Sequence, residues 1–374
     1  MTHPAIVIDD PQSVPTYADG PFSRWCRSLL ADPRDEVFVR LTLRVIATQI
    51  VAMSALYAAL RFTELPALLL AAAYLALWGW TAPPVILMLH CTMHRKFIVR
   101  PKILDWLHPF AMSFFFGMPM GYREHHIGMH HVEDNLGHDL SSTLSYRRDS
   151  FLHFLRYFGK FFLFIPVELP RYLARNKRKG MARRAVVGEL AQWALIGSMI
   201  AFVDVRFGVI AFLTPVVLCR FMMMAGNWGQ HAFINTVFPN NGLTNSITCV
   251  NSTYNKRCFN DGYHIGHHLR AKRHWSELPG DFIANQALYA EKGAIVFKQL
   301  DFFMVSLLLW LGAWNTLAKH VVRLDGPRTD AEIVAMLKSR VHPVTDWPGA
   351  DEPTRRRVES ARPAADPDAT LGTA

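Results

Sequence analysis

Four long apolar stretches constrain the fold of this chain more than any other feature of its sequence. They cover residues 45–60, 65–89, 185–203 and 207–225, and hydrophobic residues make up 51% of the 374 residues. A helix that crosses a bilayer needs about 20 mainly apolar residues, so each stretch, extended at its ends where it is short, can supply one membrane span. The sequence therefore predicts an all-α integral membrane protein.

The connections between these stretches are short. Residues 61–64 separate the first stretch from the second, and residues 204–206 separate the third from the fourth. Connections of this length join antiparallel helices, so the spans are predicted to form a four-helix bundle of two hairpins. In this arrangement the N-terminus, the long middle loop and the segment after the fourth span lie on the same side of the membrane.

The basic residues of the chain gather beside the apolar stretches. The formal net charge is +10, and the middle loop carries Arg95, Lys96 and the run RNKRK at residues 175–179. Cytoplasmic loops carry an excess of Lys and Arg, which places this loop in the cytoplasm. A basic chain can also bind nucleic acid, but here the flanks of the membrane spans account for the charge, so no nucleic-acid partner is predicted.

The remaining segments divide the chain into three parts. Residues 1–38 form a polar N-terminal segment without the features of a cleavable signal peptide, and residues 39–320 form the membrane domain. Residues 325–374 are rich in Pro, Asp, Arg and Ala and are predicted to be a disordered tail. Residues 151–173 predict an interfacial amphipathic helix. Residues 302–314 are apolar but short, which favours a helix packed on the interface, with a fifth span as the alternative.

Groups of histidines lie at the predicted cytoplasmic ends of the spans. The sequence HCTMH ends the second stretch, EHHIGMHH lies in the middle loop, and YHIGHH follows the fourth stretch. Histidines one helical turn apart project their imidazoles from one face, and neutral imidazole is a good ligand for iron, zinc or copper. A polar patch or a pH sensor is the alternative for one such group, but three groups together favour a metal site. Their candidate ligands are His90, His94, His126, His130, His131, His264, His267 and His268.

A further pair, Asn227 and His231 in NWGQH, has the same one-turn spacing at the end of the fourth stretch. Asn227 either acts as a ligand beside His231 or caps the helix end. His125 is ambiguous because its neighbour His126 fits the box better. The remaining histidines are expected not to bind metal: His3, His108, His138, His153, His274, His320 and His342.

Nine candidate histidines exceed the four to six ligands that one metal ion takes, so the sequence predicts two ions. Glu124 and Asp261 flank the boxes, but the pattern is not the Glu-x-x-His site of ferritin-like bundles. The five cysteines have no CxxC spacing that would indicate a thiolate site. A nitrogen-rich dimetal site beside a membrane predicts redox chemistry on a lipid chain.

The set HxxxH, HxxxHH and HxxHH, with spans arranged two and two, resembles the membrane fatty acid desaturase and hydroxylase superfamily over residues 45–279. The segment NDGYHIGHHLRAKRHWSELP is similar to the final box of that family. The resemblance implies a di-iron centre that activates dioxygen and takes electrons from a separate ferredoxin or cytochrome-type donor. It also implies that Asn227 and His231 match an extra ligand pair of acyl desaturases.

Two departures from the pattern leave the reaction open. Cys91 stands where many members have an acidic residue, and the second box has three residues between its histidines, as in alkane hydroxylases. The leading hypothesis is an acyl desaturase, and the alternative is a lipid, alkane or carotenoid hydroxylase. A metal transporter or sensor is a third class, but transport would require a polar pathway through the spans, which the sequence does not indicate.

Overall fold

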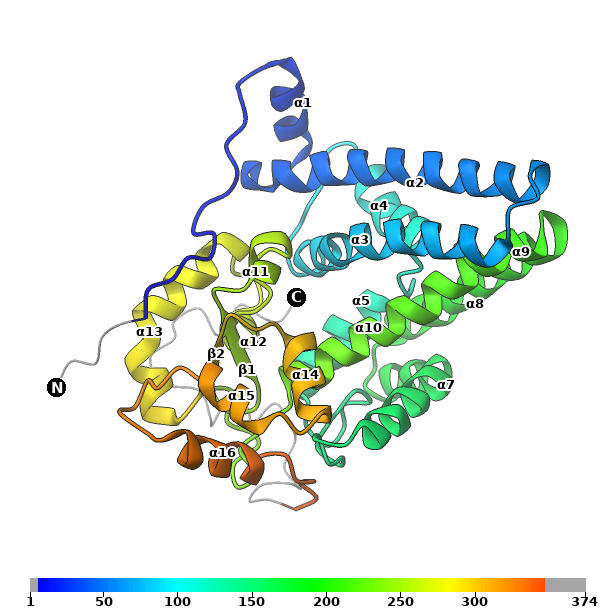
Figure 1. Ribbon diagram of the computed structural model, residues 1–374. Coiled ribbons are helices and arrows are strands. Elements are labelled where there is room, and N and C mark those ends of the chain that lie inside the picture. Colours follow the sequence, from blue (N-terminus) through cyan, green and yellow to red (C-terminus); the bar gives the residue numbers. More distant parts are fainter. Residues whose placement is uncertain (1–5, 347–374) are drawn as a thin grey trace. The chain divides into compact units, whose positions relative to one another are not determined.

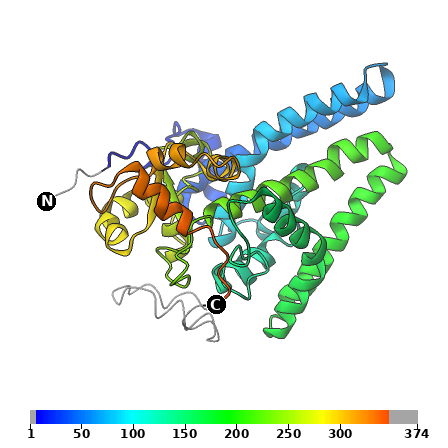
Figure 2. The same ribbon diagram turned by 60° about the horizontal axis from the view of Figure 1, so that its bottom comes forward.

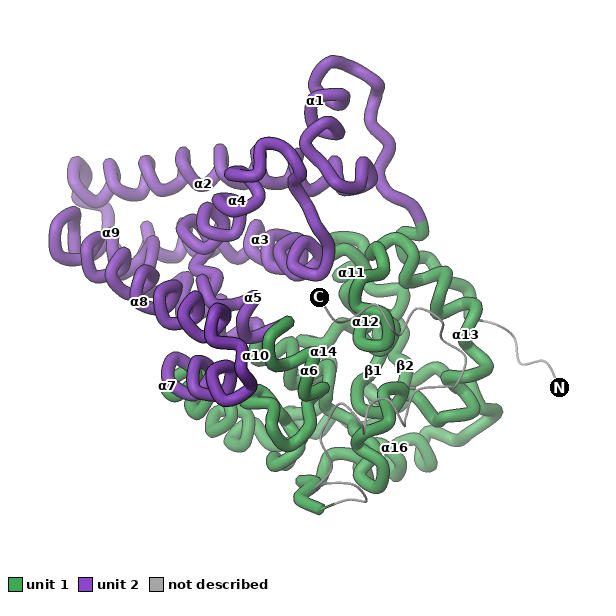
Figure 3. Tube along the Cα trace, turned by 180° about the vertical axis from the view of Figure 1, so that it is seen from behind, with its two compact units in different colours: residues 1–12, 127–165, 224–374 green, residues 13–126, 166–223 purple. Residues whose placement is uncertain are grey.

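The computed structural model describes residues 6–346 and consists mainly of helices (Figure 1). The chain folds into two compact units (Figure 3). Unit 1 comprises Met1–Gln12, Ile127–Ile165 and Met224–Ala374, and unit 2 comprises Ser13–His126 and Pro166–Met223. The unit boundaries fall inside continuous helices, so some elements begin in one unit and end in the other.

Unit 2 contains the long apolar helices. Helix α2 (Glu36–Phe62) is preceded by the short helix η1 (Pro33–Asp35) and packs beside α3 (Ala67–His94). Helix α8 (Lys179–Phe202) is followed by α9 (Val205–Gly208), the π-helical turn η3 (Val209–Leu213) and α10 (Thr214–Gln230), which continues into unit 1. Figure 2 shows the turns between α2 and α3 and between α8 and α9.

Within residues 6–346, four helices are long and apolar enough to cross a membrane, namely Pro33–Phe62, Ala67–His94, Lys179–Phe202 and Val205–Gln230. They confirm the four helices predicted from the apolar stretches. Each helix is longer than its stretch, because polar residues such as His94 at the ends continue the helix beyond the apolar run. Within unit 2, α9 is linked to the end of α2, because Arg206 Nη2 donates to Leu60 O at 2.7 Å.

A buried ion pair joins α8 to α10. Arg220 is 2% exposed, and its Nη2 donates to both carboxylate oxygens of Glu189, at 2.9 and 2.8 Å. The same nitrogen donates to Gln192 Oε1 at 3.2 Å, and Gln192 Nε2 donates to Met118 O at 2.9 Å. These polar side chains lie within helices that are otherwise mainly apolar. The two charges neutralise each other inside the protein, which is how charged residues are tolerated in membrane helices. The pair connects two helices and does not by itself indicate a transport pathway.

Shorter helices complete unit 2. They are α1 (Pro21–Leu29), α4 (Lys102–Phe116) and α5 (Tyr122–His125), together with the last turns of α7 (Phe151–Arg175). The first part of α7 belongs to unit 1 and buries Phe154 and Tyr157, whereas Leu163 and Phe164 are exposed. This helix confirms the predicted helix at residues 151–173.

Unit 1 surrounds a small parallel sheet of β1 (Ile247–Val250) and β2 (Ile295–Lys298), in which Ile247 pairs with Ile295. This sheet corrects the all-helical prediction. The strands could not be predicted from the sequence, because two buried runs of four residues are too short to be distinguished from loops by their hydrophobic pattern. The helices of unit 1 are η2 (His126–His130), α6 (His131–Glu133), α11 (Thr253–Arg257), α12 (His264–Leu269), η4 (Trp275–Glu277), α13 (Leu278–Lys292), α14 (Phe302–Trp310), α15 (Trp314–His320) and α16 (Asp330–Ser339).

Helix α14 accounts for the apolar residues 302–314. Phe302, Val305 and Leu309 are buried in the hydrophobic core that includes β1 and β2, whereas Met304 and Leu307 are exposed. With 9 residues, α14 is too short to span a bilayer, and it is not among the candidate spans found in residues 6–346. At Gly229 in α10, a side chain would overlap Phe302 O, so glycine permits the close approach of these two segments.

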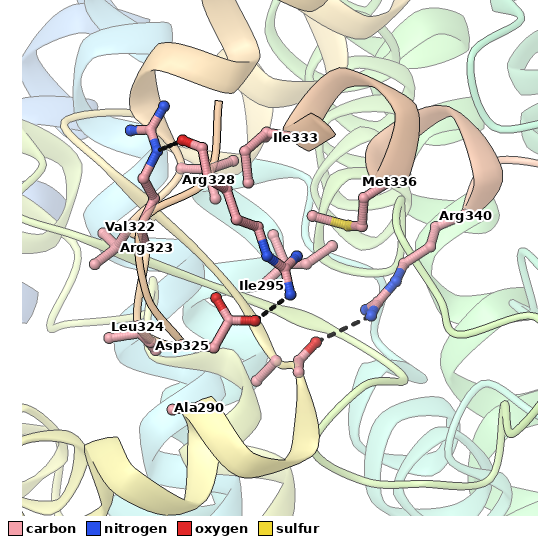
Figure 4. Close-up of a pocket in the computed structure, with 13 residues that line it drawn as sticks. Ala290, Ile295, Val322, Arg323, Leu324, Asp325, Arg328, Ile333, Met336 and Arg340 are labelled. Carbon is pink, nitrogen blue, oxygen red and sulfur yellow. Dashed lines mark hydrogen bonds and ion pairs between the residues drawn. The ribbon is translucent and has the colours of Figure 1, made fainter. Parts of the chain in front are cut away.

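The predicted disordered tail is wrong for its first part. Helix α16 begins with a capping box, in which Thr329 Oγ1 accepts from Glu332 N, and it buries Ile333 and Leu337. Arg340, which ends this helix, donates to Gly293 O at 3.1 Å beside a small pocket next to α13 (Figure 4). This helix was not predicted, because its two buried apolar residues, Ile333 and Leu337, lie one turn apart in a segment of polar composition. The rest of the predicted tail, residues 347–374, lies outside the described residues.

Candidate metal centre

Four histidines of unit 1 converge on one point and are called here the four-histidine cluster. They are His130 at the end of η2, His231 directly after α10, and His264 and His268 in α12. One ring nitrogen of each lies within 4.8 Å of the corresponding nitrogen of the others. His130, His231 and His264 are at most 3% exposed, so water does not compete for these nitrogens.

Three of these rings are oriented through their Nδ1 atoms. His130 Nδ1 lies 2.7 Å from Asp139 Oδ2, His268 Nδ1 lies 2.7 Å from Asp134 Oδ1, and His231 Nδ1 lies 2.9 Å from Asn245 O. Because a carboxylate or carbonyl oxygen can only accept, Nδ1 carries the proton and donates. Nε2 is then the lone-pair nitrogen of each ring, which is how metal-binding histidines are usually fixed.

The carboxylate of Asp139 is itself held in place. Its Oδ1 accepts from the backbone nitrogen of Ser141 at 2.8 Å and from the Ser141 hydroxyl at 2.6 Å. Its Oδ2 accepts from the backbone nitrogen of Asn135 at 3.1 Å, in addition to the contact with His130. Asp134, Asp139 and Asn245 could not be identified from the sequence, because the chain leaves the helix at Asp134 (φ 52°) and helical periodicity no longer applies. Two aspartates soon after the second box were the only signal.

Burial keeps part of the cluster uncharged. Burial and the neighbouring His268 and His130 rings lower the pKa of His231 to about 3, and burial also lowers the pKa of His264 well below its usual value. Burial lowers the pKa of His130 too, but the carboxylate of Asp139 outweighs this effect and raises it above its usual value. The 2.7 Å contact with Asp139 Oδ2 places a proton on His130 Nδ1, and a neutral imidazole is the form that binds metal.

The second and third boxes differ in helix type. Residues 126–130 form a π-helical turn, whereas His264–Leu269 form an α-helix. A π-turn accommodates about one more residue than an α-turn because its hydrogen bonds join residues five apart. The π-turn therefore accommodates the extra residue of the second box. His126 lies one turn before His130 and His131, just as His264 lies one turn before His267 and His268 in the third box.

Three histidines of unit 2 form a second group, called here the span-end trio. His90 and His94 lie one turn apart at the end of α3, and His126 begins η2. His94 Nε2 lies 2.9 Å from His126 Nε2, and the ring centres of His90 and His126 are 4.6 Å apart. The ring of Tyr122 stacks on His126 with centres 5.2 Å apart. Helical periodicity places His90 and His94 on one face of α3, whereas the fold of unit 2 brings His126 beside them.

The two remaining box histidines pair within unit 1. His131 Nε2 lies 3.2 Å from His267 Nε2, and the ring of His131 stacks on His268 with centres 4.7 Å apart. These contacts connect the pair to the four-histidine cluster. His125, which the sequence leaves ambiguous, is not in the groups of potential metal ligands among the described residues, whereas His126 is.

Asn227 lies one turn before His231, and its side-chain amide nitrogen donates hydrogen bonds within unit 1. Its Nδ2 donates to Ser141 O at 3.0 Å and to the Tyr157 hydroxyl at 2.7 Å. Ser141 in turn contacts Asp139, the partner of His130. This chain of contacts favours a role for Asn227 behind the cluster, and its role as a ligand stays a prediction.

Comparison with known proteins adds one finding. The family model described as fatty acid desaturase matches residues 63–300, a range that contains all ten predicted ligands. The same comparisons found no significant match among curated proteins or among solved structures.

Proposed function

The chain belongs to the fatty acid desaturase family, and on this premise we propose that it is an oxygen-dependent acyl desaturase that introduces a double bond into a lipid acyl chain. The four-histidine cluster carries this proposal. Its rings are buried, they face one another, and three of them are oriented through Nδ1 by groups that leave Nε2 for a metal. A nitrogen donor set of this kind fits iron.

The required chemistry explains why a metal is needed. A methylene C–H bond in an acyl chain is too strong for a side-chain acid or base, and two irons with dioxygen supply the oxidising power when they are bound. The residues of the chain hold these ions, keep water away from buried ligands such as His264, and fix protons on the Nδ1 atoms. The apolar helices supply a surface from which a lipid chain can approach.

We assign one iron to the four-histidine cluster and the other to the span-end trio, and we keep His131 and His267 among the proposed ligands. His126 and His130 occupy the two ends of the turn η2. Along the chain, the ligands of the two proposed ions are therefore joined by this single turn. Asn227 is assigned a supporting role behind His130 through Ser141 and Asp139.

The proposed topology follows from the basic loops and the short turns. The four spans form two hairpins, and the histidine boxes lie in a cytoplasmic cap beside the middle loop, where Lys and Arg are concentrated. Electrons come from a separate ferredoxin or cytochrome-type protein. The proposed substrate is an acyl chain embedded in the membrane.

One observation favours a hydroxylase as the second candidate. The second box has the longer HxxxHH spacing, and the structure accommodates it with the π-turn His126–His130. Desaturation and hydroxylation both begin by removing a hydrogen from the chain, and they differ in whether a second hydrogen leaves or a hydroxyl group is formed. The placement of the acyl chain over the metals decides between them.

Analysis of the lipids of an expressing host tests the proposal. Total fatty acids are compared by mass spectrometry, with location of double bonds, in cells that carry the wild-type chain, His264→Ala or His138→Gln. We expect a new double bond with the wild type and with His138→Gln, whose histidine is exposed, and none with His264→Ala. A new hydroxyl group would favour the hydroxylase. A host with unchanged lipids but altered metal content would contradict both.

A further inference from the structure

The N-terminal segment contains a buried carboxylate that the metal centre does not use. Asp10 is 3% exposed, although it lies in a segment without helix or strand whose neighbours Val7 and Asp9 are exposed. Moving a carboxylate out of water is costly unless hydrogen bonds compensate for the lost hydration. The contacts of Asp10 therefore indicate what this segment holds.

Three donors from the region before the third box converge on one oxygen of Asp10. Its Oδ2 accepts from the backbone nitrogen of Asn251 at 2.7 Å, from Asn255 Nδ2 at 3.0 Å and from the Tyr263 hydroxyl at 2.7 Å. These residues lie more than 240 positions away in the sequence. The loop between β1 and α12 is thus held by a segment from the other end of the chain.

Neighbouring contacts strengthen this attachment. Asn251 donates from Nδ2 to Val7 O at 2.7 Å and accepts at Oδ1 from the backbone nitrogen of Asp9 at 2.8 Å. Asn260 Nδ2 donates to Pro11 O at 2.7 Å. Ile6 and Ile8 pack against the hydrophobic core that includes Phe282 and Tyr289 of α13, beside which the dark blue segment runs in Figure 1.

Tyr263 connects this attachment to the metal ligands. It directly precedes His264, and its carbonyl oxygen accepts the hydrogen bond from His267 N at 3.0 Å that begins α12. The preceding residue, Gly262, has no room for a side chain, because an added Cβ would overlap Cys249 O and Asn255 Oδ1. Asn255, also bound to Asp10, accepts at Oδ1 from Gly262 N at 2.9 Å. Both ends of this short segment are therefore fixed by partners of Asp10.

We propose that residues 6–12 act as a strap that positions the third histidine box, with Asp10 as its positioning residue. The strap sets the start of α12 and hence the direction in which His264, His267 and His268 project. Asp10 touches neither metal nor substrate and acts only through Tyr263 and Asn255. The inference rests on the proposed function in taking the third box as a set of metal ligands.

Cobalt binding tests the strap independently of turnover. Full-length protein in mild detergent is stripped of metal and titrated anaerobically with Co²⁺, whose visible absorption reports its ligands. The variants are Asp10→Ala, Asp10→Asn and Tyr263→Phe, with Asp9→Asn as the matched control, because Asp9 is adjacent, exposed and engaged only through its backbone in the strap contacts. Melting temperature is measured on the same preparations.

We expect Asp10→Ala to weaken Co²⁺ binding about 10-fold, the lower end of the range for losing a group that orients ligands, and to alter the absorption spectrum. Asp10→Asn keeps an oxygen acceptor for the three donors and should restore most of the affinity. Tyr263→Phe removes only the hydroxyl and keeps the aromatic packing against Phe282, so it should show a smaller loss of Co²⁺ affinity. Asp9→Asn should match the wild type.

Wild-type affinity and spectrum in folded Asp10→Ala would overturn the strap, as would a lower melting temperature with unchanged affinity. If Asp10→Ala does not purify as a single species, Tyr263→Phe decides, and wild-type binding by that variant overturns the proposal. A wild-type chain that binds no Co²⁺ would instead contradict the proposed function itself, so the two failures are distinguishable.

Discussion

The four-histidine cluster and the span-end trio contain the same side chain but are built differently. In the cluster, Asp139, Asp134 and a backbone carbonyl at Asn245 orient three rings from loops that follow the helices. In the trio, His90 and His94 are placed by the periodicity of α3, and His126 by the turn that follows α5. Spacing thus predicts that two histidines share a helix face, as His90 and His94 do, whereas the groups that orient a ring from a loop are found only in the three-dimensional structure.

The largest effect is expected from removing a ring of the cluster. His268→Ala should reduce desaturation by more than about 100-fold, beyond the range typical for residues that only orient ligands, because a methyl group cannot bind metal. Product formation per folded chain measures the effect. His138→Gln is the control, since His138 is next to Asp139 in the sequence but is exposed. Activity of His268→Ala within tenfold of the wild type would contradict the assignment.

Removing a ring of the trio should separate the two metal positions. His94→Ala should also stop turnover, because the chemistry needs two ions, but it should leave one iron bound at the four-histidine cluster. Iron content per chain after anaerobic purification measures this result. Retention of two irons in His94→Ala would remove the trio from the site, and loss of both would show that the cluster does not hold its ion independently.

A smaller effect is expected from the carboxylates that distinguish the cluster from the trio. Asp139→Asn replaces the carboxylate beside His130 Nδ1 with an uncharged amide. Metal affinity should therefore fall by about 10- to 100-fold while the ring stays in place. A competition titration with a chelator measures affinity. Asp149→Asn is the matched control, because Asp149 pairs with the half-exposed Arg147, and such surface pairs contribute little. Equal affinity in both variants would mean that Asp139 does not tune the site.

The smallest effect on turnover is expected from Asn227→Ala. Its amide nitrogen donates to Ser141 O and to the Tyr157 hydroxyl, and Ser141 and Asp139 stand between it and His130. Turnover should therefore fall by about 10-fold with iron largely retained. Turnover and iron content are measured on one preparation. Unchanged turnover per folded molecule with a lower melting temperature would leave Asn227 a helix-capping role, whereas loss of one iron would make it a ligand.

The parts of the molecule that could be predicted are the helices, in which hydrophobic residues or histidines repeat with the helical period. The four long helices followed from the apolar stretches, and His264 and His268 could be placed on one face because α12 is an α-helix. The contacts that orient these rings join residues far apart in sequence. Examples are Asp10 with Tyr263, and the fully buried Arg148, which donates to Ala232 O and His342 O.

Other features escaped prediction because their signals are short. The four-residue strands β1 and β2 lie among helices, and α16 presents only Ile333 and Leu337 as buried residues within a polar composition. The buried pair of Arg220 and Glu189 shows that a charged residue in an apolar stretch can be satisfied by a partner on another span. Such partners are not visible in the pattern of either helix alone.

The metal content of the purified chain decides whether its histidines hold two irons. Wild-type protein and His264→Ala are purified anaerobically in mild detergent, and iron and zinc are measured per chain by elemental analysis. We expect about two irons in the wild type, because nine clustered histidines exceed the four to six ligands of one ion, and one iron or fewer in the variant. One ion per fully loaded wild-type chain, zinc in place of iron in active protein, or equal iron in both proteins would contradict this expectation.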